Sequence, residues 1–140
     1  MIAYFDTSAF IPLVIDEPVS AICLEFWNEA TRAVSVRILY PEARAALARA
    51  QRMGRLSRRQ LTAAVEQLDV LVDQLDCVEI TESLARAAGE MAEVHQLRGY
   101  DAVHLAAAEM IGDGDTVFVS GDQRLLDAVA RTGLAVALAR

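Results

Sequence analysis

Short apolar runs alternate with amphipathic stretches along this chain, and the two patterns predict different elements. Short continuous apolar runs have the length of buried strands, whereas apolar positions three or four residues apart indicate a helix. The helical spacing is clearest over residues 61–72, where Leu61, Val65, Leu68 and Leu71 share one face. Strands are predicted over residues 2–5, 33–36, 77–80, 116–119 and 134–137.

Helices are predicted between these strands, and several have recognisable ends. Pro18 suits the start of a helix, and Gly54 suits a helix end. Ser57 followed by Gln60 forms the Ser-x-x-Gln pattern of a capping box. Helices are predicted from about residue 9 and over residues 19–29, 41–53, 57–74, 83–96, 100–111 and 123–131, with a turn over residues 112–115.

Strands that alternate with helices predict an α/β protein with a parallel sheet covered on both faces. Because crossovers between parallel strands are right-handed, the carboxyl end of every strand lies at one edge of the sheet, with the start of the following helix. Ligands in such folds bind at this edge, where the strand order reverses. At 140 residues the chain is most simply one domain, over residues 1–140.

Four acidic residues are predicted at that edge. Asp6 follows the first strand, Glu42 lies in the first turn of the helix after the second strand, and Asp122 follows the fourth strand. Asp101 opens the helix that leads into the fourth strand, so it starts at the same edge. Each acid alone is more simply a helix cap or a first-turn residue favoured by the helix dipole. All four together favour a shared ligand.

A divalent cation resolves the repulsion among carboxylates at close range. Mg²⁺ or Mn²⁺ is the expected ion, because both prefer carboxylate and water oxygens and the chain offers no Cys/His set for zinc. Thr7 and Ser120 are expected to hydrogen-bond to the carboxylates from behind. His104 is more simply a packing or hydrogen-bonding residue, and Asp127 a surface residue.

The basic residues are concentrated in one stretch of an otherwise acidic chain. The net charge is −7, there is no lysine, and six of the 13 arginines fall within residues 43–65, where there is no acid. A solvated helical surface and a phosphate-facing surface both fit this stretch. Arg44 follows Glu42 closely, and Arg52, Arg55 and Arg59 lie further along the same stretch.

Other features predict a cytoplasmic protein. Cys23 and Cys77 lie in apolar surroundings and are expected to be reduced core residues. The first apolar run has no basic flank and contains Asp6, so a signal peptide is not expected. No apolar run approaches the roughly 20 residues needed to span a bilayer, and no membrane association is expected.

Four segments resemble the PIN-domain ribonucleases and, more narrowly, the VapC-type toxins of type II toxin–antitoxin systems. They are residues 5–9 (FDTSA), 41–47 (PEARAAL), 100–106 (YDAVHLA) and 120–126 (SGDQRLL), in the order typical of the family. The resemblance implies a three-layer α/β/α fold with a five-stranded parallel sheet in the order 3-2-1-4-5. It also implies that Asp6, Glu42, Asp101 and Asp122 form a catalytic, acidic metal site.

The resemblance further implies a Mg²⁺-dependent endoribonuclease, in which metal-activated water cleaves RNA phosphodiester bonds. It implies a cognate antitoxin that inhibits the enzyme, and a homodimer. Arg44, Arg52, Arg55 and Arg59 are then the candidates for binding RNA or the antitoxin. The alternative is a PIN-like protein that binds RNA or antitoxin without cutting. Receiver domains and haloacid-dehalogenase-type phosphatases share the architecture, but they normally need a lysine beside the phosphoryl group, and this chain has none.

Overall fold

The structure is a computed structural model that describes residues 1–112 and 114–140. The turn expected over residues 112–115 falls partly on Asp113, which lies outside the described residues. The strands are β1 (Ile2–Phe5), β2 (Arg32–Val36), β3 (Asp76–Val78), β4 (Thr116–Ser120) and β5 (Ala135–Leu138). The helices are α1 (Thr7–Phe10), the 3₁₀ turn η1 (Ile11–Leu13), α2 (Ser20–Glu29), α3 (Leu39–Arg52), α4 (Arg58–Asp73), α5 (Glu82–His95), α6 (Gly99–Ile111) and α7 (Gln123–Arg131).

The five strands form one parallel sheet in the order β3-β2-β1-β4-β5, which confirms the expected fold class. Strand β1 is central, with Tyr4 paired to Val34 of β2 on one side and to Phe118 of β4 on the other. The strand order reverses between β1 and β4, because the chain moves outward through β2 and β3 before it returns to β4. The carboxyl end of β1 is therefore where a ligand site is expected.

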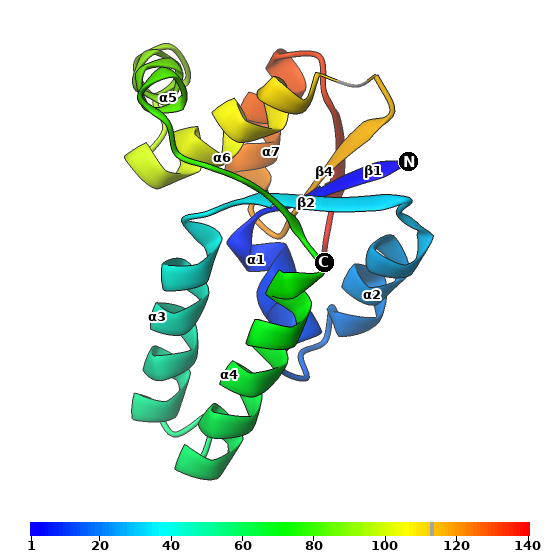
Figure 1. The fold of residues 1–140 in the computed structure, drawn as a ribbon, viewed down its shortest axis with the longest axis vertical. Coiled ribbons are helices and arrows are strands. Elements are labelled where there is room, and N and C mark those ends of the chain that lie inside the picture. The colour runs from blue at the N-terminus through cyan, green and yellow to red at the C-terminus, as the bar shows by residue number, and fades with distance from the viewer. Residues whose placement is uncertain (113) are drawn as a thin grey trace.

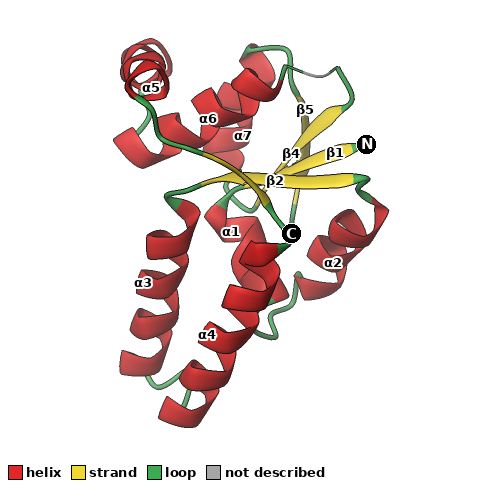
Figure 2. Cartoon of the chain, in the orientation of Figure 1, coloured by secondary structure: helices red, strands yellow, loops and turns green. Residues whose placement is uncertain are grey.

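Helices cover both faces of the sheet, as Figures 1 and 2 show. Helices α1–α4 lie on one face and α5–α7 on the other. Because side chains alternate along a strand, Ala3 and Phe5 pack into the core beside α1–α4, while Ile2 and Tyr4 pack into the core beside α5–α7. Both faces of β1 are thus apolar, as expected for a strand buried on both sides.

Several element ends differ from the predicted ones for local reasons. Helix α1 begins at Thr7 rather than near residue 9, because Asp6 caps it by accepting the Ala9 N–H at 3.0 Å. Helix α3 begins at Leu39, before Pro41, because proline is tolerated in a first turn whose N–H groups have no partner within the helix. At the two margins of the sheet, β3 is shorter than predicted and β5 lies one residue later.

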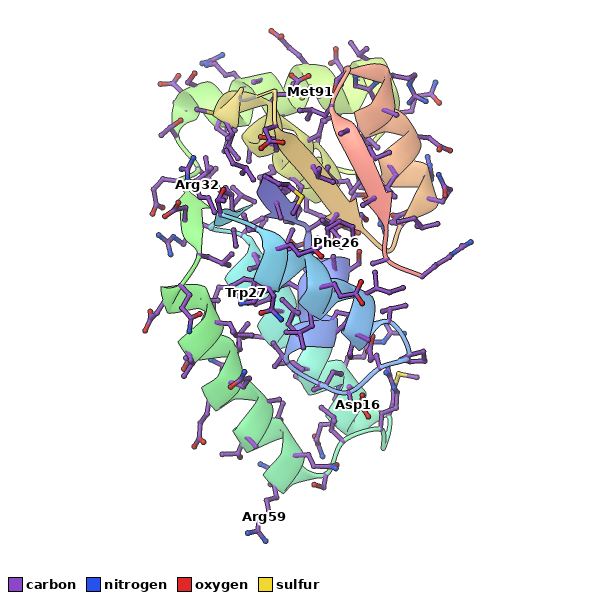
Figure 3. All side chains as sticks on the ribbon, turned by 90° about the vertical axis from the view of Figure 1, so that its right-hand side faces the viewer. Asp16, Phe26, Trp27, Arg32, Arg59 and Met91 are labelled. Carbon is purple, nitrogen blue, oxygen red and sulfur yellow. The ribbon has the colours of Figure 1, made fainter. Side chains whose placement is uncertain are left out.

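Helices α3 and α4 form a packed pair that extends away from the sheet (Figure 1). Helix α4 begins with the predicted capping box, in which Ser57 Oγ accepts the Gln60 N–H at 3.0 Å and Gln60 Oε1 accepts the Ser57 N–H at 2.8 Å. Figure 3 shows Arg59 at the outer end of this pair, where its side chain points away from the rest of the molecule.

Cys23 is buried, Cys77 is half-buried, and both are free thiols, as predicted. Among the described residues, none of the helices is long and apolar enough to cross a membrane.

Replacing Ser57 by alanine should lower the free energy of unfolding by about 0.5–2 kcal/mol, because one N–H of the first turn of α4 loses its partner. Ser83→Ala is the matched control, since Ser83 is exposed within the first turn of α5 and alanine favours a helix. Urea denaturation of both variants measures the difference. Equal stabilities would show that the cap contributes nothing to the fold.

Candidate functional site

The carboxylate of Asp6 is buried at the carboxyl end of the central strand, and its side chain is only 4% exposed. Its Oδ1 accepts from Ala9 N at 3.0 Å and from Ser8 Oγ at 2.7 Å. Its Oδ2 accepts from Ser120 Oγ at 2.5 Å. Burial raises the pKa of Asp6, and these hydrogen bonds oppose that rise without cancelling it.

Two serines tie the β1–α1 turn to the β4–α7 turn. Ser8 Oγ donates to Asp6 and accepts the Gly121 N–H at 2.8 Å. Ser120 Oγ donates to Asp6 and accepts the Asp122 N–H at 3.0 Å. The orientation of Asp6 and the backbone position of Asp122 are therefore fixed by one hydrogen-bonded network.

Glu42 reaches the same region from the first turn of α3. Its Oε1 accepts from Thr7 Oγ1 at 2.8 Å and lies 2.8 Å from Nε2 of the buried His104. His104 Nδ1 lies 2.9 Å from the hydroxyl of Tyr4, which is fully buried. A continuous polar chain thus crosses the end of the sheet, from β1 through α6 to α3.

Asp101 and Asp122 have other partners in this structure. Asp101 Oδ2 accepts from Arg98 Nε at 3.0 Å. Asp122 caps α7, since its Oδ1 accepts the N–H groups of Arg124 at 3.0 Å and Leu125 at 3.3 Å. These five residues and Leu97 line a small pocket of about 190 Å³. The pocket brings two predicted acids and two guanidinium groups together.

The structure thus places the four predicted acids at the carboxyl edge of the sheet, each at the start of a different helix: Asp6 and Asp122 cap α1 and α7, and Glu42 and Asp101 lie in the first turns of α3 and α6. Among the described residues, no three His, Cys, Asp or Glu side chains lie close enough to hold one ion together. The donor chemistry still fits Mg²⁺, which usually keeps several waters and needs only one or two carboxylates. The buried Asp6 carboxylate fits a cation as well, because a buried charge is costly without a counter-charge.

The predicted arginines lie at different distances from this edge. Arg44 is near it, on α3, where it donates to the Tyr40 hydroxyl at 3.0 Å. Arg52 lies ten residues beyond Glu42, which is about 15 Å along a helix at 1.5 Å per residue. Arg55 and Arg59 lie at the outer end of the α3–α4 pair, where Arg55 contacts Glu17 at 3.2 Å.

Three further residues contact the predicted site. Position in the sequence assigns no role at the site to Tyr4 or Ser8, whereas the packing or hydrogen-bonding role expected for His104 is confirmed. Ser8 is two residues from Asp6, and His104 lies one helical turn after Asp101. These spacings indicate that the residues are near the acids. They do not show which oxygen each one binds.

Two apolar hollows of about 530 and 520 Å³ lie along α3 and share Tyr40 and Pro41. Ile38, Val72 and Ile80 line the first, while Ala48, Leu61 and Val65 line the second. Neither hollow is lined by any of the four acids.

The comparisons with known proteins identify the family. The family model for the PIN domain matches residues 3–131. Over 139 residues the chain is 38% identical to Ribonuclease VapC49 of Mycobacterium tuberculosis, an alignment that covers 99% of this chain and 96% of VapC49. The chain therefore belongs to the PIN-domain family, and within it to the VapC proteins.

Solved structures show the same fold. VapC20 of Mycobacterium tuberculosis, a toxin that cleaves the sarcin–ricin loop, superposes with a TM-score of 0.71 at 19% identity, over 90% of this chain and 94% of VapC20. A chain of a toxin–antitoxin complex from Klebsiella pneumoniae superposes with a TM-score of 0.60 at 17% identity, over 86% of each chain.

Replacing Asp6 by asparagine should stabilise the metal-free protein, because the change removes a buried charge and keeps an oxygen to cap α1. Since burial raises the pKa of Asp6, the folded state holds this proton more tightly than the unfolded chain does. The stability of the wild type therefore falls as the pH rises from 3.8, the ordinary pKa of an aspartate, through the raised pKa of Asp6. Above the raised pKa the stability stays at this lower level.

Urea denaturation in EDTA across this pH range measures the effect. The gap between Asp6→Asn and the wild type should open as the pH rises. At neutral pH it should lie within the roughly 0.5–3 kcal/mol that single substitutions usually change. Asp16→Asn is the control, because it removes the same charge from an exposed position. A less stable Asp6→Asn at neutral pH would show that the hydrogen bonds to the carboxylate outweigh its burial.

Proposed function

We propose that this chain is a divalent-metal-dependent endoribonuclease that acts as the toxin of a cytoplasmic toxin–antitoxin pair. The observation that carries the proposal is the buried Asp6 carboxylate at the reversal of strand order, with Glu42, Asp101 and Asp122 brought to the same edge by three other elements. The identity to a protein named as a ribonuclease supports the reaction class.

Asp6, Glu42, Asp101 and Asp122 are the residues proposed to hold Mg²⁺ or Mn²⁺. When bound, such an ion supplies Lewis acidity toward a phosphate oxygen and makes water easier to deprotonate. Asp6 needs no movement to take part, because its hydrogen bonds fix it in place. Asp101 has to exchange its pairing with Arg98, whose guanidinium is exposed and can move into water, whereas the Asp101 side chain is only 15% exposed.

Two arginines beside the acids are placed to bind the phosphates of an RNA substrate. Arg98 and Arg124 line the small pocket with Asp101 and Asp122, and guanidinium groups bind phosphate oxygens with paired hydrogen bonds. If Asp101 held a metal ion, its pairing with Arg98 would be released, and Arg98 would be available for the RNA backbone. The pocket therefore combines the groups needed to position a phosphodiester, and single-stranded or looped RNA is the substrate class that fits an open edge.

The arginine-rich end of the α3–α4 pair is proposed as a second contact surface for RNA or antitoxin. Arg52 and Glu42 are too far apart to touch one phosphate, so this surface acts on a longer ligand. The apolar hollows along α3 and the net charge of −7 suit an antitoxin segment with apolar and basic side chains. The resemblance to a toxin–antitoxin complex supports such a partner, and a homodimer is the proposed assembly.

A non-cleaving PIN-like protein that binds RNA or antitoxin is the second candidate. It is favoured by the pairing of Asp101 with Arg98, and by the fact that no three ligating side chains among the described residues are gathered for a metal ion. Cleavage of total RNA with and without Mn²⁺ separates the two candidates.

Asp101→Asn should lower the rate of RNA cleavage by about 100-fold or more without unfolding the protein, because it weakens a contact worth several kcal/mol to a metal-dependent reaction. Glu90→Gln is the control, since Glu90 is an exposed acid on α5. Cleavage is followed on total RNA, and the fold by circular dichroism. Full activity of the wild type after metal removal with EDTA would rule out the proposed mechanism.

Reversing Arg52, Arg55 and Arg59 to glutamate should weaken RNA binding and flatten its salt dependence. If all three contact phosphates of single-stranded RNA, the slope of log affinity against log salt should fall by about 2. The matched control reverses Arg86, Arg131 and Arg140, which are exposed elsewhere and change the net charge equally. Titrations at several salt concentrations, in an Asp101→Asn background, measure the slope.

The same two triple variants are then titrated with the antitoxin. A loss confined to the first variant supports the α3–α4 surface in RNA or antitoxin binding, according to which ligand is affected. If the two triple variants bind RNA with the same affinity, and antitoxin with the same affinity, Arg52, Arg55 and Arg59 form an ordinary solvated surface.

A further inference from the structure

The carboxylate of Glu42 is hydrogen-bonded through one of its oxygens to Thr7 and to the buried His104. Two donors converge on Oε1 of Glu42, namely Thr7 Oγ1 and His104 Nε2, each at 2.8 Å. His104 is 2% exposed, although it is a polar residue on a helix whose other buried residues are apolar. Among the described residues, Oε2 of Glu42 has no hydrogen-bond partner. One oxygen is held by the protein, and the other is left for a ligand.

The proton positions along the polar chain from Glu42 through His104 to Tyr4 follow from its carboxylate end. A carboxylate only accepts hydrogen bonds, so the nitrogen of His104 that faces Glu42 carries a proton. In a neutral imidazole the other nitrogen, Nδ1, is then an acceptor, and the Tyr4 hydroxyl 2.9 Å away is placed to donate to it. The Glu42 carboxylate thus sets the His104 tautomer, and the Tyr4 hydroxyl complements it.

The ring of His104 has little freedom to leave this position. Tyr4 stacks on Phe118 with ring centroids 4.9 Å apart, and its edge meets His104 at 5.9 Å. Both Tyr4 and Phe118 belong to the two central strands of the sheet. Residues of the sheet thus orient the imidazole, and the imidazole orients Glu42.

We propose that His104, held by Tyr4, is a positioning residue that fixes the Glu42 carboxylate for a divalent cation. This inference rests on the proposed function, since it assigns a ligand-holding role at the same site. A free glutamate side chain loses up to roughly 1.5–2 kcal/mol of rotamer entropy when a ligand immobilises it. A side chain that is already held does not lose this again, and hydrogen bonds from behind a metal ligand typically contribute 10–100-fold in affinity or activity.

Two substitutions of similar character separate positioning from simple packing. The amide nitrogen of His104→Gln can take the place of Nε2 and still donate to Glu42, whereas His104→Asn reaches only the position of Nδ1 beside Tyr4. Isothermal titration of the metal-free protein with Mn²⁺ alone measures affinity without reference to RNA. His104→Asn should bind Mn²⁺ about 10–100-fold more weakly, and His104→Gln should recover most of this loss.

The cleavage assay adds a second readout. His104→Asn should need a correspondingly higher Mn²⁺ concentration for half-maximal cleavage, with activity restored at saturation. Tyr4→Phe removes one hydroxyl without changing ring packing, and it should weaken Mn²⁺ binding in the same direction by a smaller factor. It also serves as the test if either His104 variant fails to fold.

A double substitution tests whether the effect passes through Glu42. In a Glu42→Gln background, His104→Asn should change Mn²⁺ affinity less than twofold, because the carboxylate that it positions is gone. The same loss in both backgrounds, equal losses in His104→Asn and His104→Gln, or unchanged affinity in all variants would each overturn the positioning role while wild-type binding and cleavage stand. A wild type that neither binds Mn²⁺ nor cleaves RNA would remove the proposed function as well.

Discussion

The burial of the Asp6 carboxylate at the end of the central strand is the constraint on which the rest of this edge depends. Strand β1 has neighbours on both sides and helices on both faces, so water has little access to its end. A carboxylate there loses hydration, and the raised pKa of Asp6 reflects this loss. Three donors from the chain offset part of the cost, and a cation would offset the rest.

The same constraint organises the neighbouring turns. Ser8 and Ser120 can donate to Asp6 only if their oxygens stay in place, and each oxygen is held by a backbone N–H of the β4–α7 turn. The turn is therefore built around the carboxylate. Asp122 is fixed at the start of α7 as a consequence, even though its own side chain acts here as a cap.

Residues from both helical layers meet at this edge, because successive side chains of β1 face opposite sides of the sheet. Tyr4 faces the α5–α7 layer, where it meets His104, while Thr7 and Glu42 belong to the α1–α4 layer. The link between His104 and Glu42 joins the two layers across the end of the sheet. This arrangement explains why a histidine is buried on an otherwise apolar helix face. Its two nitrogens are satisfied by one residue from the sheet and one from the opposite layer.

Topology and sequence pattern were enough to place four acids at one edge, because right-handed crossovers leave little choice of where a strand ends. They could not predict side-chain partners. The pairing of Glu42 with His104 joins residues 62 positions apart, and no local spacing encodes it. Asp6 shows a further limit, because its position in the sequence fits both a helix cap and a ligand. The carboxylate caps α1 through one oxygen, and this hydrogen bond orients the same group toward the edge. A residue can thus follow the ordinary rules of helix capping and still be placed for chemistry by the fold around it.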